Sequence, residues 1–114
     1  MAALASSQKG DKLRTKAKSR QQSIEQYKLA AAEWIALNDT LQYAQTIRSL
    51  GFVYIRQRAY EEAIRTFSHL LLVWKGLGDT RAEGFTHLIV GRIYDLQKTT
   101  KHLLITTWLL LNTG

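Results

Sequence analysis

After the first twenty residues, apolar positions recur along the chain every three or four residues. Side chains at that spacing share one face of an α-helix, so the pattern predicts a series of amphipathic helices. Two of these helices are separated by a short turn at 56–60, which makes them a helical hairpin. Their apolar faces consist of Ile47, Leu50, Gly51 and Tyr54 in the first helix and Ala63, Phe67 and Leu70 in the second.

The same pattern returns after a shift of 40 residues. Asn38-Asp39-Thr40 comes back as Gly78-Asp79-Thr80, and in each copy the aspartate is placed to cap the helix that follows. So many special residues in one register indicate an internal repeat. An isolated helical hairpin cannot bury its apolar face, so we expect the units to stack. The shift also relates Trp34 to Trp74, Leu37 to Leu77, Gly51 to Gly91, Tyr54 to Tyr94 and Tyr27 to Phe67.

Gly51 and Gly91 fall in the middle of predicted helices, where glycine costs about 1 kcal/mol relative to alanine. We expect each glycine to mark a close helix crossing that a side chain would obstruct. The aromatic residues that recur at the repeat period are predicted to pack between helices, because stacking on nucleic-acid bases would require them to be exposed. These residues are Tyr27, Trp34, Tyr54, Phe67, Trp74 and Tyr94.

The repeat resembles the tetratricopeptide repeat family, which spaces a large residue, Leu-Gly and Tyr along one helix and Ala and Phe along the next. The closing Pro of that family is missing, and the period is 40 residues where the family has about 34. This is similar to the longer variant found in kinesin light chains and bacterial arrays. The resemblance rests on Ile47-x2-Leu50-Gly51-x2-Tyr54, Ala63-x3-Phe67, His87-x2-Val90-Gly91-x2-Tyr94 and Ser23-x3-Tyr27-x2-Ala30.

The resemblance implies an all-α fold, a short right-handed superhelical array of helix-turn-helix repeats. It divides the chain into a half repeat at 21–38, a full repeat at 39–77 and a half repeat at 78–97. In the family, the first helices of the units line a concave groove that takes peptides or partner helices. Carried over residue by residue, the groove positions are Gln45, Arg48, Phe52, Ile55 and Arg56 in one unit and Phe85, Leu88, Arg92 and Asp95 in the next.

These groove positions indicate what kind of partner to expect. Three arginines beside exposed phenylalanine and isoleucine would suit an acidic protein segment with apolar anchors; the alternative is that they are ordinary solvated charges. The Lys and Asn positions of the family's clamp for C-terminal carboxylates are not reproduced, so a chaperone-tail function is not expected. We therefore predict a non-catalytic protein–protein interaction module and a fragment of a larger scaffold.

Residues 98–114 depart from the repeat pattern, and two interpretations remain open. The segment is either the frameshifted or otherwise aberrant end of a longer array, or a genuine apolar helix that covers the last repeat. Codons read out of frame allow small residues at the family's spacing, which favours the first. The second would use Leu103, Leu104, Trp108 and Leu111. Arrays usually need about three units, so we expect exposed end faces to promote self-association or docking to a larger assembly.

The net charge of +7 comes mostly from the start of the chain. Residues 1–20 hold six of the 16 basic residues and one of the 9 acidic ones, so they account for five of the seven charges. We interpret them as a partly disordered basic leader, with a helix starting near Asp11. A solvated leader is the main expectation. Binding of nucleic acid or an anionic surface through counterion release is the alternative function.

Little in the sequence points to catalysis. Cysteine is absent, which excludes a disulfide scaffold, a thiolate metal site and a cysteine nucleophile. His69, His87 and His102 have no second ligand at metal spacing, and we expect His87 to pack between helices. The adjacent Glu61 and Glu62 point in different directions on a helix and form no acid–base pair. No apolar run approaches the ~18 residues that span a bilayer. We expect a cytoplasmic protein that is not an enzyme and binds no cofactor or metal.

Overall fold

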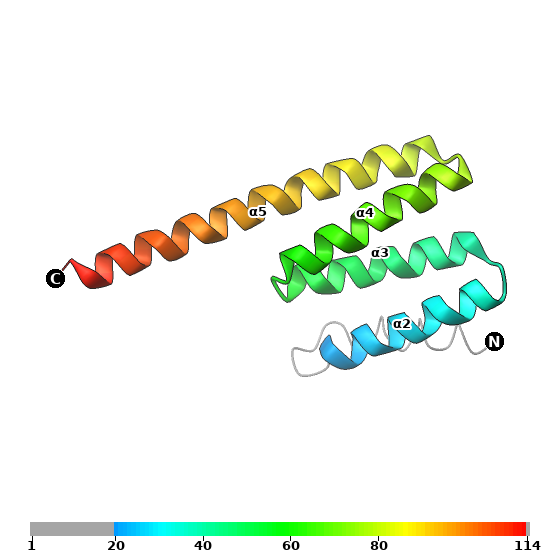
Figure 1. The fold of residues 1–114 in the computed structure, drawn as a ribbon, viewed down its shortest axis with the longest axis horizontal. Coiled ribbons are helices and arrows are strands. Elements are labelled where there is room, and N and C mark those ends of the chain that lie inside the picture. Colours follow the sequence, from blue (N-terminus) through cyan, green and yellow to red (C-terminus); the bar gives the residue numbers. More distant parts are fainter. Residues whose placement is uncertain (1–19, 114) are drawn as a thin grey trace.

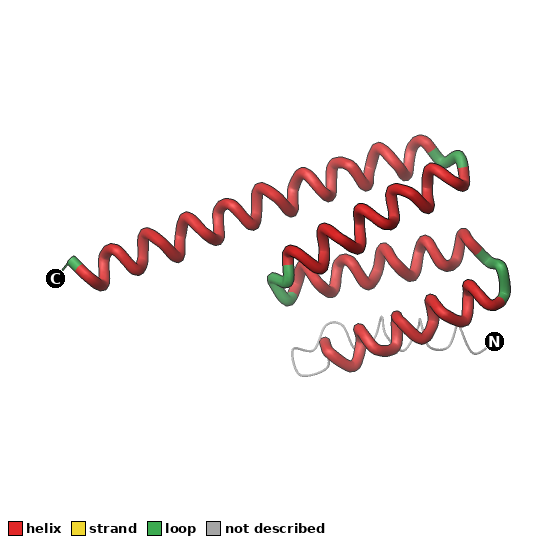
Figure 2. The backbone as a smooth tube through the Cα atoms, viewed as in Figure 1, coloured by secondary structure: helices red, strands yellow, loops and turns green. Residues whose placement is uncertain are grey.

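The computed structural model of the chain describes residues 20–113. These residues form an all-α fold of four helices without a strand, which confirms the helices predicted from the apolar spacing. Consecutive helices run in opposite directions, and each packs on the next one along the chain (Figures 1 and 2). Apart from Arg20, the predicted leader at 1–20, with its helix near Asp11, lies outside the described residues. The helices are α2 (Arg20–Ala36), α3 (Thr40–Arg56), α4 (Tyr60–Leu77) and α5 (Thr80–Asn112).

The three turns between these helices are short and closed in the same way. Each contains one residue in the left-handed region of backbone conformation, with φ of 56° at Asn38, 60° at Arg58 and 73° at Gly78. A left-handed residue after a helix lets the next N–H groups bond back to its last carbonyls. The amide of Asp39 donates to the Trp34 carbonyl at 3.0 Å, and that of Asp79 donates to the Trp74 carbonyl at 3.1 Å. The predicted turns are therefore confirmed.

Aspartates cap the starts of α3 and α5, as predicted from the repeated Asp-Thr pairs. The Asp39 carboxylate accepts a hydrogen bond from the Gln42 amide at 3.1 Å, and the Asp79 carboxylate accepts one from the Ala82 amide at 3.0 Å. Ala59 stands at the start of α4 without a side-chain cap. Among α3, α4 and α5, two helices thus begin with the same kind of cap, 40 residues apart.

Removing a cap tests this contact. Asp39→Ala should lower the free energy of unfolding by about 1 kcal/mol, because an amide at the start of α3 loses its acceptor. Urea denaturation followed by circular dichroism measures the change. Asp39→Asn is the matched control and should retain most of the stability, since asparagine caps about as well. Equal losses in both variants would assign the effect to the negative charge near the helix N-terminus instead.

The core lies between the helices and is built largely from the recurring aromatic residues. Tyr27, Trp34, Phe67 and Trp74 are buried, and Tyr54 is half-buried against the core. The prediction is wrong for Tyr94, which is 54% exposed. The remaining fully buried large side chains include Val53, Leu70 and Ile93.

The two mid-helix glycines differ in their surroundings. A Cβ atom on Gly51 would lie 2.5 Å from two ring carbons of Phe67, so the close crossing predicted there is confirmed. Gly91 is exposed, and a Cβ atom on it would meet nothing within 4 Å. The predictions of a close crossing at Gly91 and of a packed His87 are therefore wrong, because no described helix covers that side of α5.

The last helix continues beyond the rest of the fold. α5 runs without a break through residue 98, where the repeat pattern ends, and its final turns project past α2, α3 and α4 (Figure 1). Leu103, Leu104, Trp108 and Leu111 are exposed and do not cover the last repeat. That part of the second interpretation is wrong, since the helix continues outward instead of turning back onto the fold.

Candidate functional site

The candidate site is a surface formed by α3 and α5, with two adjoining hollows. The first, of about 300 Å³, joins Gln45 and Arg48 of α3 to Phe85 and Ile89 of α5. The second, of about 640 Å³, follows α5 along Phe85, Leu88, Arg92 and Asp95. Phe85 and Ile89 line both hollows, so they form one continuous surface. The structure thus brings together six of the nine positions carried over from the family and adds Ile89. The three positions that line neither hollow are Phe52, Ile55 and Arg56.

Apolar side chains on this surface face water. Phe85 is 67% exposed and Leu88 is 72% exposed, although both are large enough to contribute to a core. Ile89 is half-buried and packs against the core beneath them. Exposed apolar side chains rimmed by charged residues are typical of protein interaction surfaces. This surface therefore has both the anchors and the rim of a binding site.

Phe52 supports this surface from below instead of lining it. The guanidinium carbon of Arg48 lies 5.7 Å from the centre of the Phe52 ring, within the range of a cation–π contact. Phe52 in turn meets Phe67 edge-on, with ring centres 5.3 Å apart. The sequence placed Phe52 among the exposed groove residues, whereas its half-buried ring links Arg48 to the core.

Ile55 and Arg56 lie at the far end of α3 and line neither hollow. Ile55 is half-buried and packs against the core. Arg56 is exposed, and its backbone carbonyl accepts a hydrogen bond from the Arg20 guanidinium at 3.3 Å. These two predicted positions are therefore separate from the candidate site.

The charges around the candidate site are available to a ligand. Arg48, Arg81 and Arg92 border the two hollows, and none of them forms an ion pair with another residue of the 20–113 segment. The Asp79 carboxylate is occupied in capping α5. A guanidinium with free donors binds carboxylates through paired, charge-assisted hydrogen bonds. The local chemistry thus favours an acidic group beside an apolar one.

Sequence reasoning missed a third hollow, of about 430 Å³, at the ends of α2, α3 and α4. Ile35, Tyr43 and Leu72 are among its lining residues. The Tyr43 hydroxyl is hydrogen-bonded to Nε2 of His69 at 2.7 Å, and burial raises the pKa of Tyr43 above its usual 10.0. The signal that could have found this hollow is that Ile35 and Leu72 are apolar yet lie off the buried faces of their helices.

Other kinds of site receive no support from residues 20–113. Within that segment, no three His, Asp or Glu side chains gather closely enough to hold a metal ion. His87 and His102 are exposed, and His69 is engaged with Tyr43. No described helix is long and apolar enough to span a membrane.

In comparisons with known proteins, no protein-family model, no curated protein and no solved structure matches this chain.

Proposed function

We propose that the helices of residues 20–97 are tandem hairpins of the tetratricopeptide type and that the protein is a non-catalytic interaction module. Local contacts that recur after 40 residues support the repeat. Asp39 and Asp79 cap their helices alike. Farther along the same helices, Thr46 and Thr86 donate side-chain hydrogen bonds to the carbonyls of Gln42 and Ala82. Hairpins stacked at a constant step would curve into a superhelical array.

The partner that suits the candidate site best is an acidic peptide or helix with an apolar anchor. The observation that carries this proposal is that Arg48 of α3 and Phe85 of α5 line one hollow. A carboxylate would bind the Arg48 guanidinium, while an aliphatic or aromatic side chain would pack against Phe85 and Ile89. Neither residue alone would discriminate such a segment from other acidic or apolar surfaces.

Selection from a displayed random peptide library on the full chain tests this function. We expect the enriched peptides to combine Asp or Glu with a large apolar residue. Arg48→Ala and Phe85→Ala should each weaken the binding of a selected peptide about tenfold or more, because each removes one of the two contacts. Fluorescence anisotropy of the labelled peptide measures the affinity.

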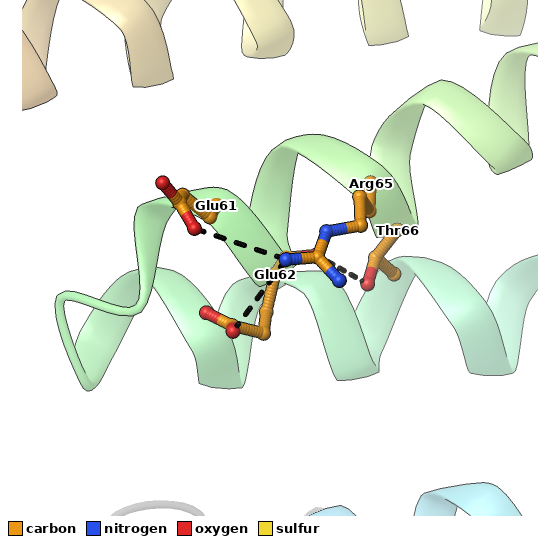
Figure 3. A network of polar contacts seen from close by, with 4 residues as sticks. All are labelled: Glu61, Glu62, Arg65 and Thr66. Atoms are coloured by element: carbon orange, nitrogen blue, oxygen red, sulfur yellow. Dashed lines mark hydrogen bonds and ion pairs between the residues drawn. The ribbon is translucent and has the colours of Figure 1, made fainter.

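Arg65→Ala is the matched control for Arg48→Ala. Arg65 lies on α4 within 4.0 Å of the Glu61 and Glu62 carboxylates, outside both hollows (Figure 3). Its substitution removes the same charge, and exposed ion pairs of this kind add little to stability. Peptide binding should be unchanged in this variant. Selected peptides that bind the Arg48→Ala and wild-type chains equally would exclude the proposed site.

The alternative function in nucleic-acid or anionic-surface binding was predicted from the basic leader. Apart from Arg20, that leader lies outside residues 20–113, and no feature of the described helices favours this alternative.

A further inference from the structure

Two helix faces that correspond through the 40-residue shift differ in whether another helix covers them. On α3, Gly51 lies against Phe67 of α4, and Ile47 and Tyr54 pack with the core cluster that contains Phe67. Leu50, on the edge of this face, packs with Ile24 and Tyr27 of α2. The corresponding residues of α5 are His87, Val90, Gly91 and Tyr94, which we call the open face. His87, Gly91 and Tyr94 are exposed, and Val90 is half-buried.

The covered face shows which side chains such a surface accepts. Phe67 of α4 lies so close to Gly51 that a Cβ atom there would be 2.5 Å from its ring. Ala63 and Leu70 lie one turn to either side of Phe67 and are also fully buried. Such a glycine therefore accepts a helix with a particular spacing of side chains. The helix presents a small residue, then an aromatic residue four positions later, then a leucine three positions after the aromatic residue. The space above Gly91 is empty to at least 4 Å.

We propose that the open face of α5 is a docking site for an amphipathic helix of a partner protein. The partner helix presents a small, an aromatic and a leucine residue at the spacing of Ala63, Phe67 and Leu70. It also carries carboxylates in its first turn. The open face shares His87 and Gly91 with the second hollow of the candidate site. It does not include Arg48 or Phe85, which carry the function proposed above, so different variants test the two proposals.

Charge complementarity supports the carboxylates. Beyond Tyr94, the open face continues along α5 past Lys98 and borders Lys101, and the sequence has no acidic residue from 96 to 114. Lys101 also lines a hollow with Glu61 and Glu62 of α4, so Lys98 carries most of this argument. A helix packed antiparallel to α5, as α4 packs on α3, begins next to these lysines (Figure 1). α4 itself has Glu61 and Glu62 in its first turn. Acidic side chains there also interact favourably with the helix dipole.

The open face is long enough for a whole helix. The 22 residues 87–108 of α5 span about 33 Å at the rise of an α-helix, whereas the 18 residues of α4 span about 27 Å. Tyr94, Ile105 and Trp108 are at intervals that keep them on this side of α5, and all three are exposed. Helices that bind other proteins commonly lay such an apolar stripe into a complementary surface.

A second copy of this chain fits the open face less well than such a partner. In a symmetric pair, a twofold axis through the middle of the open face places Lys98 of one copy near Lys98 of the other. Like charges facing each other oppose association. The small–aromatic–leucine stripe of a second copy is unavailable as well, because Ala63, Phe67 and Leu70 are buried in its own core.

The test uses a synthetic peptide of residues 59–78 as the probe. In the peptide, Arg65→Lys provides an amine that forms a side-chain lactam with Glu61 on the solvent side. The lactam holds the peptide in a helix, and circular dichroism measures its helix content. We expect saturable binding of the labelled peptide to the full chain, measured by fluorescence anisotropy. Phe67→Ala in the peptide should weaken binding about tenfold or more, because the aromatic ring over Gly91 is lost.

Two variants of the full chain locate the binding. Gly91→Leu should abolish it by filling the space above the helix. Gly76→Leu, at an exposed glycine of α4 that also has nothing within 4 Å, should leave it unchanged. A helical peptide that fails to bind, or that binds wild-type and Gly91→Leu chains equally, overturns the proposal. The proposal is also overturned if sedimentation velocity shows that the wild-type chain is a dimer and that Gly91→Leu dissociates it. The open face would then bind a second copy of the chain.

Discussion

Phe67→Ala should lower the free energy of unfolding by about 3–5 kcal/mol, the range measured for phenylalanine deletions in well-packed cores. Phe67 is completely buried. It covers Gly51, meets Phe52 edge-on and belongs to the main core cluster with Leu70 and Ile93. The backbone around Gly51 cannot collapse into the space that the ring leaves, so a cavity remains. For a domain with a typical total stability of about 5–15 kcal/mol, such a loss threatens folding.

Urea denaturation followed by circular dichroism measures this effect. Leu72→Ala is the matched control, because Leu72 lies on the same helix but is 69% exposed. It should change the free energy of unfolding by no more than about 0.5 kcal/mol. If the two variants lost similar stability, the core would not be organised around Phe67.

Alanine at the two corresponding glycines should change stability in opposite directions. Gly51→Ala introduces a Cβ atom 2.5 Å from the Phe67 ring. We expect it to cost about 1–3 kcal/mol, as overpacking of a core does, even though alanine favours the helix. Gly91→Ala meets no atom within 4 Å, so only the helix propensity changes. That substitution should stabilise the chain by up to about 1 kcal/mol.

A double-mutant cycle identifies the cause of the Gly51 effect. If the new methyl group clashes with the aromatic ring, Phe67→Leu should relieve part of the cost of Gly51→Ala, and the two changes should not be additive. When Phe67→Leu is combined with Gly91→Ala instead, the two changes in the free energy of unfolding should be additive, because Gly91 has no contact with Phe67. A loss of stability from both glycine substitutions would contradict the difference between the two faces.

Local features of the fold could be predicted from the sequence because their causes lie within a few residues of each other. Asp39 and Asp79 cap the helices they precede through amides three residues away. The spacing of Ala63, Phe67 and Leu70 places them on one face of α4 whatever that face packs against. Even the close crossing at Gly51 could be inferred, because a glycine in the middle of a helix lowers helix stability unless a close contact requires the absence of a side chain.

Features that depend on a more distant part of the chain could not be predicted. His87, Gly91 and Tyr94 repeat the pattern of a covered face, but whether they are covered depends on the course of the chain beyond Gln97. α5 continues outward there, and all three are exposed. In the candidate site, the resemblance places Phe52 in the groove, and only the position of the Phe67 ring shows that Phe52 supports Arg48.

The order in which the helices pack also bears on how the chain folds. Each described helix packs mainly on its neighbour in sequence, so the core of residues 20–113 does not require α2 and α5 to meet. Contacts between neighbouring segments need only short loops to close, and proteins dominated by such contacts fold fast. Any adjacent pair of helices can therefore act as a nucleus to which the next helix is added. The middle of the chain, where α3 and α4 each have neighbours on both sides, is where native structure should persist longest during unfolding.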